Sequence, residues 1–318
     1  MKHFFSVQDI DTIEDWVQQA IALKQNPLAH ANLGKDKTLG LLFFNPSLRT
    51  RLSTQKAALN LGMHTLVMNF DKEGWAIEYE DGSIMHAGKS EHIKEAAQVI
   101  SQYCDVLAIR AFAKLENRTE DYQEVVIQSF MKYASIPVIN MESATGHPLQ
   151  ALTDAITVTE HKDESKKRPK VVLTWAPHPK ALPQAVANSF VEVMQKMDVD
   201  LCIANPEGFD LSPDIVKDTP VLHNQEQALA NADFVYAKNW SAFYDYGKTA
   251  PLQTDWQVTG QDMQQTNNAK FMHCLPVRRN VVVADEVLDS ENTLVIQQAH
   301  NRTYAAQLVL KKVLENKH

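Results

Sequence analysis

The most informative part of the chain is the stretch from Thr38 to Arg51, which reads T-L-G-L-L-F-F-N-P-S-L-R-T-R. Its apolar half predicts a buried strand over Leu39 to Phe44. Its polar half predicts a helix start, with Ser47 as the N-cap and Arg49 and Thr50 in the first turn. The unpaired N–H groups and the positive dipole end of a helix start suit a phosphate, whereas a cation there opposes the dipole. Surface arginines on an exposed helix start are the alternative. We favour a phosphate site, because a bound anion resolves that conflict.

The alternation of short apolar runs with helical patterns continues through both halves of the chain. Strands separated by helices of this length are typical of parallel sheets built from βαβ units, so we predict an α/β fold with two central parallel sheets flanked by helices. The expected strands are Leu39 to Phe44, Thr65 to Asn69, Val106 to Arg110, Val138 to Asn140, Val171 to Trp175, Leu201 to Ala204, Phe234 to Lys238 and Phe271 to Cys274.

The composition is that of an ordinary globular protein, with 318 residues, 44% hydrophobic and 22% charged. This length is enough for two domains. The formal net charge of -8 argues against a basic surface for nucleic acid or anionic lipid. The N-terminus does not resemble a secretory signal, and no apolar run approaches the ~20 residues that span a membrane. Three separated cysteines argue against a disulfide framework or a zinc site, so we expect a cytoplasmic protein.

The two halves divide near the sequence M-E-S-A-T-G-H-P. We predict a first domain over residues 1–146 and a second over 147–300, with a helix from Pro148 towards Glu160 bridging them. A final helix over 301–318 has apolar residues on one face, and we expect it to complete the first domain.

Polar residues follow several other predicted strands. Arg110 ends one strand, His147 and Gln150 follow the next, and Cys274 lies in H-C-L-P-V-R-R near the end of the chain. Ligands of open α/β sheets bind at the carboxyl ends of strands, so these residues are candidates for one site. Each alone is a weak signal, and Cys274 has no evident base to make it a nucleophile. No G-x-G-x-x-G follows the first strand and no Walker motif occurs, which disfavours a dinucleotide or nucleotide site.

Taken together, S-L-R-T-R, H-P-L-Q and H-C-L-P-V-R-R resemble the transcarbamylases, which include aspartate and ornithine carbamoyltransferases. The resemblance covers essentially the whole chain, with the motifs in family order. Within the family, the chain is similar to the N-acylornithine group. It lacks the S-M-G motif that grips free ornithine and carries Y-A-K-N-W-S-A-F-Y in that place.

The resemblance favours a succinyl over an acetyl group on the acceptor, while the acetyl alternative stays open. Acetyl-specific relatives carry a glutamate where this chain has Ser90, and a glutamate would repel a succinyl carboxylate. Succinyl relatives carry a proline there, so Ser90 departs from both patterns. The acetyl relatives also carry a modified lysine where this chain has Val282.

The implied reaction transfers the carbamoyl group of carbamoyl phosphate to the δ-amine of N2-succinylornithine in arginine biosynthesis, without metal or organic cofactor. The resemblance implies a homotrimer whose active sites are shared between subunits, with Trp75 supplied by a neighbour.

The expected carbamoyl phosphate site comprises Ser47, Leu48, Arg49, Thr50, Trp75, Arg110, His147, Gln150, Cys274, Leu275 and Arg302. Of these, the resemblance assigns the catalytic roles to Arg49, Thr50, Arg110, His147, Gln150, Cys274 and Arg302. The expected acylornithine site comprises Glu142, His178, Lys238, Arg278 and Ser90.

The resemblance also implies a trefoil knot in the second domain, although threaded chains are almost absent from proteins. The proline-rich stretch from Ala176 to Gln184 matches the loop through which the chain passes in the N-acylornithine enzymes. An ordinary strand-to-helix connection, with Pro183 opening the helix, is the alternative.

Two further readings belong to other classes. A non-catalytic protein that binds a phosphorylated metabolite could keep this fold. The presence of Arg49, Arg110, His147 and Gln150 argues against it, because a binding protein would not need residues that polarise the carbamoyl group. A dehydrogenase is disfavoured by the missing glycine fingerprint.

Overall fold

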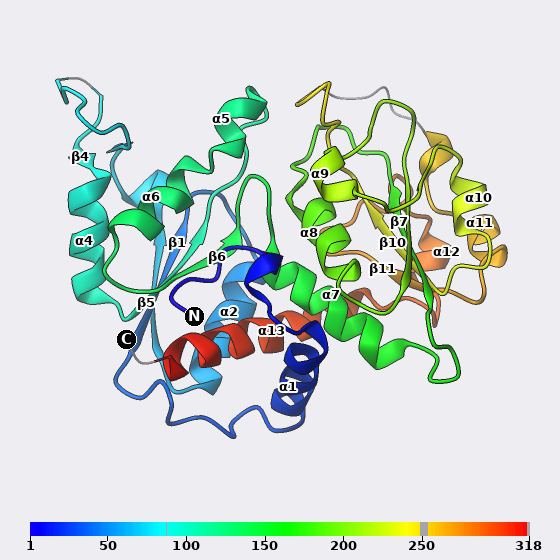
Figure 1. Cartoon of the computed structure of the whole chain (residues 1–318), viewed down its shortest axis with the longest axis horizontal. Helices are drawn as coiled ribbons and strands as arrows, with labels where there is room; N and C mark the ends of the chain where they lie inside the picture. The colour runs from blue at the N-terminus through cyan, green and yellow to red at the C-terminus, as the bar shows by residue number, and fades with distance from the viewer. Residues whose placement is uncertain (87, 249–253, 317–318) are drawn as a thin grey trace.

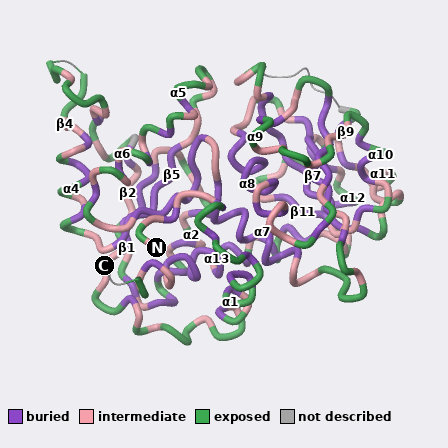
Figure 2. The backbone as a smooth tube through the Cα atoms, viewed as in Figure 1, coloured by how far each residue is buried: buried purple, intermediate pink, exposed green. Residues whose placement is uncertain are grey.

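The computed structural model describes residues 1–86, 88–248 and 254–316. Figure 1 shows two α/β units side by side, joined by two long helices. Each unit contains one central parallel sheet, as the strand pattern predicted. Figure 2 shows that buried backbone runs through both sheets and through the helices between the units.

The first sheet has the strand order β2-β1-β5-β6 and all its pairs are parallel. Along β1, Leu39, Leu41 and Phe43 enter one core cluster and Leu42 enters another, so both faces of the strand are buried. Its strands are β1 (Thr38–Phe43), β2 (His64–Asn69), β5 (Val106–Arg110) and β6 (Val138–Glu142). The helices of this part of the chain are η1 (Val7–Asp9), α1 (Ile13–Gln25), α2 (Arg49–Asn60), α3 (Phe70–Glu73), α4 (Ile93–Tyr103), α5 (Arg118–Tyr122) and α6 (Val125–Tyr133).

The second sheet has the order β11-β10-β7-β8-β9 and is also parallel. Its strands are β7 (Lys170–Trp175), β8 (Asp200–Ala204), β9 (Val221–Leu222), β10 (Phe234–Lys238) and β11 (Lys270–Met272). Its helices are α8 (Ala185–Met194), α9 (Pro213–Val216), α10 (Gln225–Leu229), η2 (Thr254–Trp256), α11 (Gly260–Gln264) and α12 (Asp285–Leu288). The short strand β9 has no counterpart among the predicted strands. The predicted last strand is shorter than expected, because pairing ends at Met272.

Two helices join the units, α7 (Pro148–His161) and α13 (Val295–Glu315). Pro148 opens α7, where its missing N–H costs nothing. Helix α13 packs against α1, α2 and α7 (Figure 1). It begins six residues before the predicted Asn301, because the apolar positions that bury it continue back to Val295. The predicted end at residue 318 lies outside the described residues.

A third, two-stranded parallel sheet pairs β3 (Ile77–Glu78) with β4 (Glu91–His92). The segment that carries it, residues 74–92 without residue 87, projects from the first unit on the side away from the second (Figure 1). We call this segment the finger.

The predicted knot stays a prediction. The segment after β10 does lie beside the 176–184 loop: Asn239 Nδ2 donates to the Ala176 carbonyl at 2.7 Å, and Ser241 N donates to the Leu182 carbonyl at 2.9 Å. Stretching the unfolded chain by its two ends tests the knot. A knotted chain of 318 residues stops short of the full length expected at about 3.6 Å per residue, and an unknotted chain reaches it.

Candidate active site

The first sheet reverses its strand order between β1 and β5, which are neighbours although β2 follows β1 in the chain. Ligands of open α/β sheets bind beyond such a point. The segment Ser47 to Thr50 follows β1, and Arg110 is the last residue of β5. The predicted phosphate loop and Arg110 therefore lie at the same edge.

The second sheet reverses its order between β7 and β10. His178 follows β7, and Lys238 ends β10. Both reversal points open into one cavity of about 800 Å³ between the units. A cavity of this size suits small-molecule substrates.

The cavity lining is strongly basic although the chain as a whole is acidic. Of the described residues that line it, seven are Arg or Lys and one, Glu142, is acidic. Of the predicted site residues, the cavity is lined by Ser47, Leu48, Arg49, Thr50, Arg110, Glu142, His147, His178, Lys238, Cys274, Leu275, Arg278 and Arg302. Such a cavity favours a ligand, or two ligands, with several negative charges.

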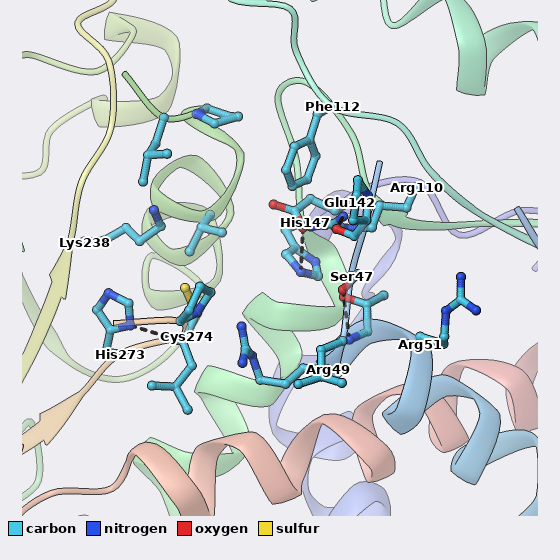
Figure 3. Close-up of a pocket in the computed structure, with 18 of the residues that line it drawn as sticks. Ser47, Arg49, Arg51, Arg110, Phe112, Glu142, His147, Lys238, His273 and Cys274 are labelled. Atoms are coloured by element: carbon cyan, nitrogen blue, oxygen red, sulfur yellow. Dashed lines mark hydrogen bonds and ion pairs between the residues drawn. The ribbon is translucent and has the colours of Figure 1, made fainter. Parts of the chain in front are cut away.

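The phosphate loop has a geometry that suits an anion. The predicted N-cap is wrong by one residue, because α2 begins at Arg49 and its N-cap is Leu48. Ser47 Oγ nevertheless accepts from Thr50 N in the first turn, at 3.3 Å. Arg49 is half-buried and points into the cavity (Figure 3), and burial lowers the pKa of its guanidinium. Among the described residues, none forms a hydrogen bond or ion pair with the Arg49 guanidinium. A desolvated cation without a partner is costly, and an anion in the cavity offsets that cost.

Arg110, Glu142 and His147 form a buried cluster at one wall (Figure 3). Arg110 Nε and Nη2 each lie 3.2 Å from Glu142 Oε2, and its Nη1 donates to the carbonyls of Asn45 and Pro46. Arg110 thereby fixes the two residues that directly precede the phosphate loop. Burial raises the pKa of Glu142, against the Arg110 charge.

His147 lies with Nε2 3.4 Å from Glu142 Oε2 and with Nδ1 buried and unpartnered among the described residues. Burial and then the charges of Arg302 and Arg110 hold its pKa well below the usual value. The ring is therefore neutral near pH 7 and has one N–H to donate.

Gln150 lies behind the cavity wall rather than in its lining. Its Oε1 accepts from Arg302 Nη1, and its Nε2 donates to Asp154 at 2.6 Å. Arg302 Nη2 donates to Thr50 Oγ1 at 2.7 Å. In this arrangement Gln150 contacts Arg302, and its expected contact with the ligand stays a prediction.

The opposite wall carries the residues expected for an acylornithine. Lys238 is buried. Among the described residues its Nζ donates to the Asn239 carbonyl at 2.9 Å and pairs with no carboxylate. Arg278 Nε donates to His178 Nε2 at 3.1 Å, which makes His178 the tautomer protonated at Nδ1. Burial raises the pKa of the Cys274 thiol, so Cys274 is not a thiolate nucleophile.

Trp75 and Ser90 lie in the finger and do not line the cavity of their own chain. Trp75 is 60% exposed, its Nε1 donates to Glu91 at 2.8 Å, and Ser90 N donates to the Ala76 carbonyl at 3.0 Å. Ser90 therefore pairs with the residue that follows Trp75 in the chain, and the finger that carries both projects from the first unit on the side away from the second (Figure 1).

Several lining residues were absent from the prediction. Phe112 stacks under the Arg110 guanidinium at 4.0 Å, and His273 Nδ1 accepts from Leu275 N at 2.8 Å. Burial lowers the pKa of His273 to about 3, so its ring is neutral and can accept the hydrogen bond from Leu275 N. Both residues lie within two positions of a strand's carboxyl end, and that placement was the available signal. The other unpredicted lining residues include Arg51, Asn69, Lys72 and Asn239.

Comparison with known proteins identifies the family. Residues 2–160 match the aspartate/ornithine carbamoyltransferase carbamoyl-P binding domain, and residues 183–313 match the aspartate/ornithine carbamoyltransferase Asp/Orn binding domain. The chain is 48% identical over 318 residues to N-succinylornithine carbamoyltransferase of Bacteroides fragilis, covering 99% of each chain. It is 39% identical over 331 residues to N-acetylornithine carbamoyltransferase of Xylella fastidiosa, covering 98% of each.

Comparison with solved structures leads to the same family. The crystal structure of acetylornithine transcarbamylase complexed with acetylcitrulline is 36% identical and superposes with a TM-score of 0.92, covering 98% of this chain and 99% of that one. A glutamate-to-proline variant of N-acetyl-L-ornithine transcarbamylase, complexed with carbamyl phosphate and N-succinyl-L-norvaline, has the same identity and TM-score, covering 98% and 100%. The chain belongs to the aspartate/ornithine carbamoyltransferase family.

Proposed function

We propose that this protein transfers the carbamoyl group of carbamoyl phosphate to the δ-amine of N2-succinylornithine, giving N-succinylcitrulline and phosphate in arginine biosynthesis. The observation that carries the proposal is the basic cavity between two family domains, in which Arg49 and Lys238 have no carboxylate partner in the described chain. Relatives at 48% and 47% identity bear the name N-succinylornithine carbamoyltransferase.

The reaction joins the δ-amine nitrogen to the carbamoyl carbon through a tetrahedral intermediate. The bond from that carbon to the phosphate oxygen then breaks, phosphate leaves with the electron pair, and the nitrogen loses a proton. The protein positions two substrates and stabilises the charge that develops on oxygen.

For carbamoyl phosphate, we assign the phosphate to the backbone N–H groups of Ser47 to Thr50 and to the Arg49 guanidinium. Arg110 and His147 polarise the carbamoyl oxygen. The Nε2 of His147 lies 3.4 Å from Glu142, a separation long enough for a substrate oxygen to take the N–H instead. The carbonyls of Cys274 and Leu275 accept from the carbamoyl amino group, and Arg302 completes the pocket.

For the acylornithine, we assign its carboxylates to Lys238 and Arg278, which lie on the second wall. Glu142 and His178 complete that part of the site. A succinyl group adds a carboxylate to the acceptor, and the excess of cations over Glu142 favours it.

We assign Ser90 to the acyl end and Trp75 to the carbamoyl phosphate of a neighbouring subunit, in a homotrimer with shared sites. The support is that both residues lie outside the cavity of their own chain. Exposed leucines at positions 52 and 59 of α2 and at position 66 of β2 offer an apolar surface to that neighbour. We place the reaction in the cytoplasm, where three unpaired cysteines stay reduced. None of the described helices is long and apolar enough to cross a membrane.

Transfer to N2-acetylornithine is the second candidate, because relatives at 39% identity bear that name. Product formation with succinyl-, acetyl- and free ornithine at equal concentration separates the candidates. We expect succinylornithine to be used with the highest kcat/KM and free ornithine not at all. Preference for acetylornithine would reverse the acyl assignment. Tight binding of carbamoyl phosphate with no product from any acceptor would indicate a binding protein.

A further inference from the structure

A buried carboxylate lies beneath the active site and has no role in the reaction described above. Asp154, on α7, is fully buried and does not line the cavity. Its Oδ1 accepts from Gln150 Nε2 at 2.6 Å and from Gln298 Nε2 at 2.7 Å. One oxygen therefore holds the amide groups of two different helices, α7 and α13.

Each of these amides passes a hydrogen bond on to a residue that lines the cavity. Gln150 Oε1 accepts from Arg302 Nη1, and Gln298 Oε1 accepts from the backbone N–H of His273 at 3.0 Å. Arg302 continues to Thr50 Oγ1 at 2.7 Å, in the first turn of α2. Asp154 is thereby linked to both walls of the cavity.

The orientation of both amides follows from the chemistry of Asp154. A side-chain amide has an oxygen that accepts and a nitrogen that donates, and Asp154 Oδ1 accepts. Both amide nitrogens must face it, so both amide oxygens face the active site. A flipped Gln150 would present its NH2 group to a guanidinium, and a flipped Gln298 would present it to a backbone N–H. Either pair of donors would lose its hydrogen bond inside a buried region.

We propose that Asp154 is a positioning residue: through Gln150 and Gln298 it sets the place of Arg302 and of the His273 to Leu275 segment around the carbamoyl group. It touches no substrate. The inference rests on the proposed carbamoyl transfer, because it assigns the purpose of this network to that reaction.

Replacing Asp154 by asparagine and by leucine tests the inference. Asp154→Asn keeps an accepting oxygen, so kcat should stay within about threefold of wild type. Asp154→Leu has a similar volume but no acceptor, and a displacement of about 1 Å at the reacting group costs roughly 100-fold in rate. We therefore expect kcat per folded subunit to fall about 100-fold in the leucine variant, with a smaller change in the KM for carbamoyl phosphate.

Thr153→Val is the matched control. Thr153 is also buried on α7, but its hydroxyl donates only to the Leu149 carbonyl of its own helix at 2.7 Å. This variant should lose stability and keep its kcat. A merely structural role for Asp154 predicts the same pattern for Asp154→Leu, and that pattern would overturn the inference.

Gln298→Met decides the question if Asp154→Leu does not fold. It removes the acceptor for His273 N and leaves Asp154 and Gln150 in place, so a folded variant should lose about tenfold in kcat. A kcat equal to wild type would refute the proposed role of the hydrogen bonds from Asp154 through Gln298 to His273. The wild-type assay separates the two claims: if wild type transfers no carbamoyl group, the proposed function fails, and if wild type and both apolar variants transfer it equally, only the role of Asp154 fails.

Discussion

Thr50 and Arg302 are joined by a hydrogen bond of 2.7 Å, from Nη2 of the arginine to Oγ1 of the threonine, although 252 positions separate them in the chain. Arg302 also donates to Gln150, and both acceptors are buried. Arg49 lies in the same cavity, yet the described chain offers it no such partner. The two arginines therefore differ in what their removal does to the fold.

Replacing each arginine by alanine should separate binding from stability. Arg49→Ala should reduce kcat/KM by about 100-fold or more, by analogy with removal of a donor that stabilises an anion, and change the free energy of unfolding by less than about 0.5 kcal/mol. Arg302→Ala should lose activity and also about 1–3 kcal/mol for each buried acceptor left unpaired. Steady-state kinetics and urea unfolding measure both quantities. An Arg49→Ala variant with near-normal activity would contradict the anion site.

Subunit mixing tests the proposed contribution of Trp75 to a neighbouring site. Arg49→Ala and Trp75→Ala subunits should each be inactive alone, because each site lacks one group. Mixed trimers contain some sites that carry neither lesion, so activity should return in part after reassociation. Mass spectrometry of the mixed oligomers supplies the control. Proven exchange of subunits without any recovery would count against a shared site.

Gly247 holds a close contact between the units. Its φ is +75°, and a Cβ there would lie 1.9 Å from the Leu115 carbonyl oxygen. Gly208 has φ +83° with nothing near the position of a Cβ, so it carries the same backbone strain without the clash. Both alanine variants should lose about 1–2 kcal/mol from a left-handed backbone. Gly247→Ala should lose clearly more, and equal losses in urea unfolding would contradict the contact.

The pH dependence of stability should report the buried Asp154. Burial raises its folded-state pKa to about 7, against the opposing hydrogen bonds from Gln298 and Gln150. Because the unfolded pKa is about 3.9, the folded state binds more protons between these values, and wild type loses stability as the pH rises through that window.

Asp154→Asn cannot ionise, so its stability relative to wild type should rise between pH 4 and 7, by up to about 1.4 kcal/mol per pH unit. Contributions from Glu142 and His147 occur in both proteins and cancel in the difference. Unfolding in urea at several pH values measures it. A difference that stays constant across this range would show that Asp154 titrates normally.

The sequence predicted the strands well because their apolar runs are short and bounded by polar residues. Val106 to Arg110 and Phe234 to Lys238 match β5 and β10 at both ends. The two-residue strands β3, β4 and β9 were not predicted, since pairs this short carry no periodic signal.

Some residues of the candidate site could likewise be predicted from the sequence, and others could not. Arg110 and His147 could be named because strand ends mark the place where ligands bind. Asp154 and Gln298 could not, because their roles depend on helices α7 and α13 meeting at a buried point, 144 positions apart in the chain. No local sequence pattern indicates that two distant helices come into contact. Resemblance to a family supplied the substrates, which charge and spacing alone left open.

Transfer of labelled carbon from carbamoyl phosphate to N2-succinylornithine is the decisive test of the proposed reaction. Carbamoyl phosphate labelled with ¹³C at the carbonyl is incubated with the protein and N2-succinylornithine, and the products are followed by ¹³C NMR and mass spectrometry. We predict that the label appears in the ureido group of N-succinylcitrulline, with one phosphate released per ureido group formed, and that Arg49→Ala produces no such signal. Release of phosphate with no labelled ureido product, in the presence of folded wild-type protein, would contradict it.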